Sequence, residues 1–278
     1  MAKARRANIM GADATQFPDR QDPRKRKLRT SMNERYDSTA AKHYAAFRPP
    51  LHSLILDRVM RPDESFQVGL DVGCGTGYSA VALAKYCDHV FGLDPNRSML
   101  DVAQQHHKIT YLQGSGDALG QLVAEAIDVV TFAGSLFYVK TERLRRELVR
   151  ACPPGASIVV YDFEVLFHEV MAELRVDCPA VASDYDHRVN LSDWYEFSAD
   201  CSGAERLRLD VTGREMAHLL LADSNRYDAL VERFSNGDPF ESLVGYLDTR
   251  HLKMGIDADI YFTRYRVLGG MMIDPSLV

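Results

Sequence analysis

The feature that most constrains this chain is a set of glycines at alternate positions directly behind a short apolar strand. Residues 69–77 read Gly-Leu-Asp-Val-Gly-Cys-Gly-Thr-Gly, and an amphipathic helical pattern follows. Glycine tolerates positive φ and has no Cβ, so Gly73, Gly75 and Gly77 let a ligand lie against the backbone where strand turns into helix. The segment therefore predicts a ligand-binding turn between a strand and a helix.

The spacing of these glycines excludes two common nucleotide-binding turns. A dinucleotide fingerprint needs glycine at position 78, which is Tyr78. A P-loop needs a lysine near its end, and no lysine occurs between Phe66 and Ala84. Asp71, at the end of the strand, is a poor partner for a pyrophosphate but suits an ammonium group. We therefore expect a ligand that is cationic at this end.

The run from Leu70 to Gly77 resembles motif I of class I S-adenosylmethionine-dependent methyltransferases, in their small-molecule, methyltransferase type 11-like branch. Later segments resemble the family's motifs in the expected order. They are residues 89–103 for the second strand, 114–118 for the third motif, 127–133 and 157–162 for strands four and five, and 36–50 for the N-terminal lid helix. The resemblance covers roughly residues 34–165 and implies S-adenosylmethionine as the cofactor.

The resemblance also implies how the adenosine part of the cofactor is held. Asp94 matches the acidic residue that takes both ribose hydroxyls in the family. Asp117 matches the acidic residue that faces the adenine amino group, and the next amide, that of Ala118, faces a ring nitrogen. Met99 lies on the following helix, where the family often lays a side chain against adenine, although core packing is the alternative.

The methionine part of the cofactor is assigned to the lid helix and to the turn. Tyr44 and Arg48 are four residues apart and share a helix face. Arg48 would pair with the cofactor's carboxylate and Tyr44 would close over its sulfonium. The full set of expected cofactor-binding residues is Tyr44, Arg48, Asp71, Gly73, Cys74, Gly75, Asp94, Pro95, Met99, Asp117, Ala118 and Ala133.

Alternating strand and helix patterns from 67 to 165 predict an α/β fold. We expect a doubly wound, Rossmann-like, mostly parallel seven-stranded sheet, with N-terminal lid helices and an inserted cover on the acceptor side. The expected domain is 31–278, with a cofactor-binding core at 34–165, a substrate-cover insertion at 166–255 and a closing strand at 256–268. Within the insertion, we expect the aromatic-rich segment 178–203 to cover the acceptor.

Composition limits the class of protein. With 46% hydrophobic and 26% charged residues, the chain can fill a core. Neither a membrane-spanning run nor a secretory signal is visible, and the five cysteines form no C-x-x-C pair, so we expect a cytoplasmic protein without a zinc site. Residues 1–30 carry nine Lys or Arg and three Asp, and they predict a basic disordered tail. The whole chain has a net charge of −6, so the rest of the chain is acidic.

The acceptor-side residues are expected after strand four and in the cover. Ser135, Phe137 and Tyr138 follow that strand, and Trp194 lies in the aromatic-rich segment. The candidate general bases are His168 and His187, because histidine titrates near neutral pH. The other histidines lack ligand-like spacing, so no metal site is expected.

The predicted reaction is in-line transfer of a methyl group from S-adenosylmethionine to an O, N or C atom of a small molecule. One alternative is methylation of RNA or protein, for which the basic tail is the only support, and the acidic body argues against nucleic acid. A second alternative is a non-catalytic cofactor-binding protein. An oxidoreductase is disfavoured by the glycine spacing. The sequence specifies neither the acceptor molecule nor the oligomeric state.

Overall fold

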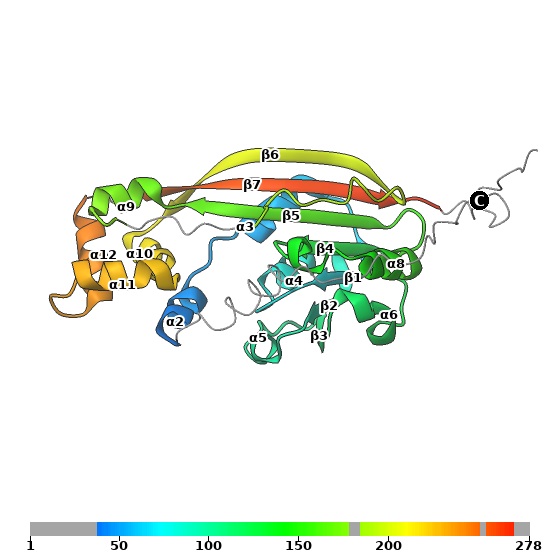
Figure 1. The fold of residues 1–278 in the computed structure, drawn as a ribbon, viewed down its shortest axis with the longest axis horizontal. Helices are drawn as coiled ribbons and strands as arrows, with labels where there is room; N and C mark the ends of the chain where they lie inside the picture. The colour runs from blue at the N-terminus through cyan, green and yellow to red at the C-terminus, as the bar shows by residue number, and fades with distance from the viewer. Residues whose placement is uncertain (1–37, 178–183, 251–253, 270–278) are drawn as a thin grey trace, which may run out of the picture. The chain divides into compact units, whose positions relative to one another are not determined.

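The computed structural model describes residues 38–177, 184–250 and 254–269 (Figure 1). Contacts divide the chain into two units, residues 1–35 and 36–278, and every described element belongs to the second. The expected basic tail lies outside the described residues, as does the beginning of the expected N-terminal helix. Within the described ranges, no helix is both long enough and apolar enough to span a membrane.

Seven strands form one sheet in the order β3-β2-β1-β4-β5-β7-β6 (Figure 1). They are β1 (Phe66–Val72), β2 (Cys87–Asp94), β3 (Ile109–Gln113), β4 (Val129–Ala133), β5 (Ser157–Leu166), β6 (Phe197–Val211) and β7 (Met254–Val267). The first five strands pair in parallel, whereas β7 pairs antiparallel with both β5 and β6. The predicted α/β, mostly parallel seven-stranded sheet is therefore confirmed.

Helices cover both faces of this sheet. The helices up to β5 are α2 (Ser38–Ala46), α3 (Leu51–Val59), α4 (Tyr78–Leu83), α5 (Arg97–Asp101), the 3₁₀ turn η1 (Gly116–Ala118), α6 (Leu119–Leu122), α7 (Leu136–Val139) and α8 (Glu142–Ala151). Buried side chains of α3 and α4 share one core with the strands. Those of α6 and α8 share another core, on the opposite face. This is the doubly wound arrangement that the alternation of elements predicts.

β5 is longer than its parallel neighbour β4. The β4–β5 register ends with Ala133 opposite Tyr161, but β5 continues to Leu166 paired with β7. β7 pairs with β6 over the full length of both strands and with β5 from Ser157 to Leu166. These three strands therefore extend together past the carboxyl edge of the parallel sheet (Figure 1). We call this part the β5–β7–β6 extension.

Four helices gather at the far end of the extension, and we call them the cap (Figure 1). They are α9 (His168–Leu174), α10 (Gly213–Leu221), α11 (Ser224–Arg233) and α12 (Pro239–Arg250). The cap has a core of its own, built mainly from leucine, valine and methionine side chains. Helix α10 begins with a capping box, in which the side chains of Thr212 and Glu215 accept hydrogen bonds from each other's backbone amides.

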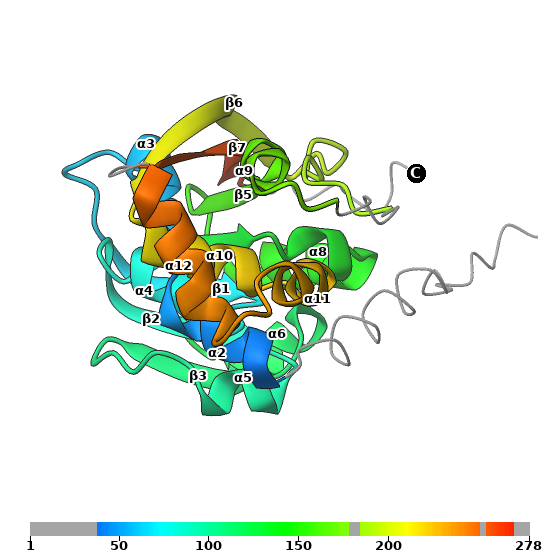
Figure 2. The same ribbon diagram turned by 90° about the vertical axis from the view of Figure 1, so that its left-hand side faces the viewer.

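Helix α2 packs against the cap rather than against the parallel sheet (Figure 2). His43 Nδ1 lies 3.0 Å from His218 Nδ1 of α10. The ring of Phe240 in α12 lies 5.1 Å from that of His43 and 4.5 Å from that of His218. The described part of the lid helix therefore contacts two helices of the cap, α10 and α12.

Several elements differ from what the local sequence pattern predicts. The pattern predicts a strand over 206–211, whereas β6 runs from Phe197 and only its last part has a buried alternation. It predicts a helix over 97–106, whereas α5 ends at Asp101. It does not predict helix α11. The expected cover segment 178–203 divides into residues 178–183, outside the described residues, a loop at 184–196, and the first part of β6.

Candidate functional site

The glycine turn lies at the carboxyl end of β1, between β1 and α4. The amide of Gly73 donates to the carbonyl of Leu93 on β2, with an N to O distance of 2.7 Å. All three glycines have positive φ, at 76°, 53° and 85° for Gly73, Gly75 and Gly77. The turn therefore uses the backbone region that favours glycine at each of these positions.

The three glycines face different surroundings. A Cβ at Gly73 would lie 2.5 Å from Ser135 Cβ, and one at Gly77 would lie 2.1 Å from the Tyr111 hydroxyl oxygen. A Cβ at Gly75 would meet no atom of the described residues within 4 Å. Gly73 and Gly77 are thus needed for packing, whereas Gly75 presents bare backbone to open space, as a bound ligand requires.

Asp94 ends β2 beside this open face. Its carboxylate accepts hydrogen bonds from the amide of Gly75 at 2.9 Å and from the amide of Asn96 at 2.7 Å. Only 8% of the residue is exposed. Pro95 follows in the same turn and is exposed. The structure therefore brings Asp94 and Gly75 together, although they are 19 residues apart.

Asp71 lies beneath the turn and is fully buried. Its two oxygens accept hydrogen bonds from the hydroxyls of Ser79 and Thr131, which ties the first turn of α4 to β4. Burial raises the pKa of Asp71 to about 6, although both hydroxyls lower it. Its expected contact with an ammonium group stays a prediction. Cys74, also buried, has its thiol pKa raised by burial, so it is no nucleophile near neutral pH.

The residues expected at the adenine lie at the ends of β2 and β3. Met99 is half-buried on α5. Asp117 lies in η1, where its carboxylate accepts a hydrogen bond from the Thr141 hydroxyl at 2.6 Å. The amide of Ala118 donates to the carbonyl of Ser115 at 2.9 Å. These positions border the same edge as Asp94, and their contacts with adenine stay predictions.

Two side chains that the sequence analysis did not identify, Asp162 and Tyr185, hold the turn after β4. Asp162, just past the end of the parallel register on β5, accepts from the Tyr185 hydroxyl at 2.6 Å. The Tyr185 oxygen also lies 2.7 Å from the carbonyl of Gly134. The ring of Phe137 lies 4.9 Å from that of Tyr185, and the ring of Tyr138 lies 5.5 Å from it. The expected acceptor-side aromatics are therefore brought together here.

Ser135 takes part in the packing of this turn. It is 8% exposed, and its hydroxyl donates to the carbonyl of Val72 at the end of β1. The hydroxyl therefore links the turn after β4 to the start of the glycine turn. Ala133, which ends β4, is half-buried at the same edge.

The two candidate histidines are in different environments. His187 Nδ1 lies 2.9 Å from Asp162 Oδ2, and this hydrogen bond raises the pKa of His187. His168, at the start of α9, has a side chain that is 70% exposed and lies 4.0 Å from Glu169. The structure therefore places His187 beside the turn after β4 and His168 on the surface of the cap.

Trp194 lies in the core shared with α6 and α8 rather than over an open cavity. It is 8% exposed, and its ring centroid lies 6.0 Å from that of Phe197. The ammonium of Lys140 lies 5.5 Å from the ring. This burial differs from the expected contact with an acceptor, and it arises because the 184–196 loop contributes Leu191 and Trp194 to the core.

A cavity of about 160 Å³ lies under the β5–β7–β6 extension, between the lid segment and the cap. The lid segment contributes Tyr44, Arg48, Pro49 and His52, the extension Phe163, Val165 and Phe167, and the cap Leu219, Ala222, Asp223 and Arg226. The guanidinium carbon of Arg48 lies 3.1 Å from the centroid of the Tyr44 ring. The expected pair therefore shares one cavity with residues of the cap.

His52 is a residue of this cavity that the sequence did not single out. Its Nδ1 lies 3.0 Å from the hydroxyl oxygen of buried Tyr161 on β5. Burial, and then the charge of Arg48, lower the pKa of His52 to about 4, so the ring is neutral near pH 7. The charge of Asp162 acts to raise the pKa of His52, and its hydrogen bond raises the pKa of His187. One carboxylate therefore influences the pKa of both histidines. The position of His52 directly after the lid motif was the available sequence clue.

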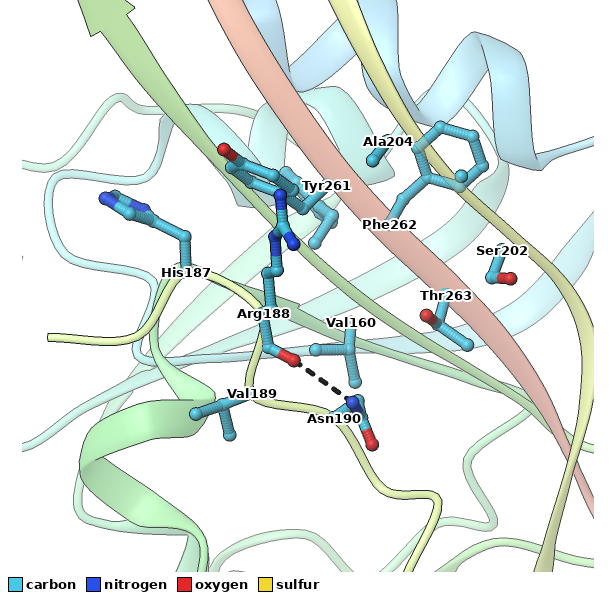
Figure 3. A pocket seen from close by; sticks show the side chains of 12 residues that line it. Val160, His187, Arg188, Val189, Asn190, Ser202, Ala204, Tyr261, Phe262 and Thr263 are labelled. Atoms are coloured by element: carbon cyan, nitrogen blue, oxygen red, sulfur yellow. Dashed lines mark hydrogen bonds between the residues drawn. The ribbon is translucent and has the colours of Figure 1, made fainter.

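A larger hollow of about 360 Å³ lies on the opposite face of β5, β7 and β6 (Figure 3). Figure 3 shows the Arg188 side chain reaching toward Tyr261, where its guanidinium carbon lies 5.1 Å from the ring centroid. His187 is at the rim and points away from Arg188. Among the described residues that line this hollow, none is an expected cofactor-binding residue, whereas Tyr44 and Arg48 line the smaller cavity. We therefore take the smaller cavity as the candidate acceptor site.

Among the residues that the structure describes, no three His, Cys, Asp or Glu side chains are grouped so that they could hold a metal ion. The donor groups gathered at the carboxyl edge are instead backbone amides, carboxylates and aromatic rings. This set suits an organic cofactor with hydroxyl groups and a positive charge.

Comparisons with known proteins agree with this geometry. Residues 70–160 match the family model described as a methyltransferase domain. The chain is 25% identical over 222 residues to the probable S-adenosylmethionine-dependent methyltransferase of Saccharomyces cerevisiae, covering 77% of this chain and 72% of that protein. It is 34% identical over 122 residues to a ubiquinone biosynthesis O-methyltransferase of Pseudomonas fluorescens, covering 39% of this chain and 51% of that protein.

A solved structure of a candidate type II methyltransferase from Anaeromyxobacter dehalogenans has the same fold. The two chains are 20% identical and align with a TM-score of 0.55, over 81% of this chain and 100% of the other. The family match covers the glycine turn and the strands up to β5. The structural match extends over most of the chain and shows the fold alone.

Proposed function

We propose that this chain is a class I S-adenosylmethionine-dependent methyltransferase of the type 11 family and that its acceptor is an oxygen, nitrogen or carbon atom of a small molecule. The observation that carries the proposal is the cavity of about 160 Å³ under the β5–β7–β6 extension. The cavity lies between the lid segment and the cap and is lined mainly by apolar side chains with a few charged groups, which suits a small molecule rather than a macromolecular segment.

The cofactor is proposed to lie along the carboxyl edge of the parallel strands. The bare backbone at Gly75 leaves room for it. Asp94 would accept hydrogen bonds from the ribose hydroxyls, since a carboxylate oxygen has more than one lone pair and already holds the turn through backbone amides. Arg48 would pair with the cofactor's carboxylate and Tyr44 would face its sulfonium. S-adenosylmethionine supplies the methyl group, and the chain's own residues align and shield it.

His187 lines the hollow on the opposite face of the extension and not the cavity, so it is proposed as the general base only for an acceptor whose reacting atom reaches the turn after β4. Asp162 holds its Nδ1, which leaves Nε2 to take the proton. Because this hydrogen bond raises the pKa of His187, the neutral imidazole forms at a higher pH than in an ordinary histidine. Turnover should therefore rise with pH through a pKa higher than 6.5.

The test combines binding and turnover. Calorimetry should give micromolar affinity for S-adenosylmethionine and none comparable for NAD. A panel of small metabolites should release S-adenosylhomocysteine, and His187→Gln should lower kcat and flatten the pH rise without changing cofactor affinity. His168→Gln is the matched control and should behave as wild type. Tighter binding of NAD would refute the cofactor assignment, and release only with RNA or protein would refute the small-molecule acceptor.

A further inference from the structure

The cavity under the extension carries an excess of positive charge. Its lining contains two guanidinium groups, Arg48 and Arg226, and one carboxylate, Asp223. His52 adds no charge near neutral pH, because burial and Arg48 lower its pKa to about 4. The cofactor brings one carboxylate to this region, and Arg48 is proposed above to take it. Arg226 is then the cation that a second anionic group would meet.

Arg226 is held in place by contacts from its own side of the cavity. Its guanidinium carbon lies 4.0 Å from the centroid of the Phe167 ring, and its Nε donates to the carbonyl of Leu220 at 3.4 Å. Nη1 lies 3.9 Å from Asp223 Oδ2, a looser separation than a direct hydrogen bond. The Arg226 side chain is 19% exposed, so its charge is partly shielded from water. A guanidinium fixed in this way is pre-organised for a planar anion.

The rest of the wall is apolar. Pro49, Phe163, Val165, Phe167, Leu219 and Ala222 line the cavity beside the two arginines. An apolar wall with one planar, fork-shaped donor matches a molecule that has a hydrocarbon body and a carboxylate head. A phosphate could use the same fork, but its second negative charge is disfavoured by the Asp223 carboxylate, which lies 3.9 Å from Arg226.

We propose that the acceptor is a small carboxylic acid, whose carboxylate is bound by Arg226 and whose apolar body lies against Phe163, Val165 and Leu219. This inference rests on the proposed function, because it takes the cavity as the acceptor site. Arg226 is then a specificity-determining residue for methyl transfer, and the cofactor site does not include it.

The test measures binding of short aliphatic and aryl carboxylic acids, each beside its primary amide, by calorimetry on the full chain saturated with S-adenosylhomocysteine. At least one acid should bind about tenfold or more tightly than its amide, as expected for a charge-assisted hydrogen bond. Arg226→Gln should abolish this preference, and Arg226→Lys should restore only part of it. Benzylphosphonate, included with the panel, should bind more weakly than phenylacetate.

The control is Arg233→Gln. Arg233 lies on the same helix, its guanidinium carbon is 5.4 Å from the Phe234 ring, and it does not line the cavity. This variant should keep the preference for acids, and all variants should keep wild-type affinity for S-adenosylhomocysteine and an unchanged melting temperature. Equal binding of acids and amides, tighter binding of the phosphonate, or an acid preference that survives Arg226→Gln would overturn the inference. Failure of the wild-type protein to bind S-adenosylhomocysteine would instead overturn the proposed function.

Discussion

The glycine turn and the cavity under the extension are built in different ways. The turn is closed by backbone amides and by Asp94, whose partner Gly75 is 19 residues away. The cavity is closed by side chains from three distant segments, and the lid contact from His43 to His218 spans 175 residues. The glycine turn is thus fixed mainly by local contacts, whereas the cavity, including Tyr44 and Arg48, depends on tertiary packing. We therefore expect substitutions on the cap side of the cavity to change acceptor binding without disturbing the glycine turn.

The largest expected effect is loss of stability at the turn. Gly77→Ala should lower the free energy of unfolding by about 4 kcal/mol, from left-handed backbone strain plus overpacking. The new Cβ would meet the Tyr111 hydroxyl, which cannot retreat because it donates to the carbonyl of Gln104 and its ring packs on Gly92. Urea denaturation measures the change.

The matched control is Gly155→Ala. Gly155 has φ 89°, close to the 85° of Gly77, but a Cβ there meets no described atom within 4 Å. It should cost about 1–2 kcal/mol, which is the backbone strain alone. Equal losses in the two variants would show that packing against Tyr111 does not restrict the turn.

The second prediction concerns the buried carboxyl beneath the turn. The pKa of Asp71 is about 6 in the folded protein against 3.8 for the ordinary group, so the folded state holds its proton over a pH range where the unfolded state has lost it. The contribution of Asp71 to stability is therefore present below about pH 4 and is lost as pH rises to about 6. It amounts to about 3 kcal/mol.

Asp71→Asn tests this directly, since an amide does not titrate. The stability of wild type relative to the variant should fall across pH 4 to 6 and stay level above it, when both are measured by urea denaturation at a series of pH values. Asp57→Asn, at an exposed carboxylate of α3, is the control and should leave the wild-type slope unchanged. A constant difference between wild type and Asp71→Asn would contradict the raised pKa.

The third prediction separates cofactor binding from stability. Asp94→Asn keeps the shape of the side chain but weakens its acceptance of the ribose hydroxyls, so affinity for S-adenosylhomocysteine should fall by about 2 kcal/mol. Calorimetry measures the loss, and thermal melting should show that the fold survives. Unchanged affinity in a folded variant would remove Asp94 from the proposed site.

The smallest expected effect lies in the cavity. Phe167→Leu removes the ring beneath Arg226 and should weaken binding of a carboxylic acid by about 1 kcal/mol, the scale of a cation–π contact. Affinity for S-adenosylhomocysteine should not change. Tyr261→Leu is the control, because Tyr261 is also half-buried, lies 5.1 Å from Arg188 and does not line the cavity. A loss of cofactor affinity in Phe167→Leu would mean that acceptor binding and cofactor binding are not independent.

The five parallel strands, β1 to β5, were predicted well because the sequence signals that mark them are local. Glycine spacing, and acidic residues at the ends of strands, place Gly75, Asp94 and Asp117 along one edge, and the structure has them there. The antiparallel strands and the cap were predicted less well. The first part of β6 has exposed, mostly small residues and pairs only with a distant strand, so its sequence shows no alternation.

The candidate site divides in the same way. His52 and Arg226 share a cavity only because the lid and the cap pack together, and no spacing in the sequence reports that contact. Trp194 was expected at the acceptor because aromatic side chains cluster around it in the chain. Its burial against Phe197 follows from the path of the 184–196 loop, which pattern alone does not define.

The place of β7 in the sheet has a consequence for synthesis on the ribosome. β7 follows every other described element in the chain, yet it lies between β5 and β6. Each parallel strand after β1 finds a partner that has already been made, but β6 must wait for residues 254–267 before it gains a neighbour. During that interval the nascent protein has its parallel strands and glycine turn but not its β5–β7–β6 extension. If the cavity under the extension binds the acceptor as proposed, acceptor recognition requires synthesis past residue 254.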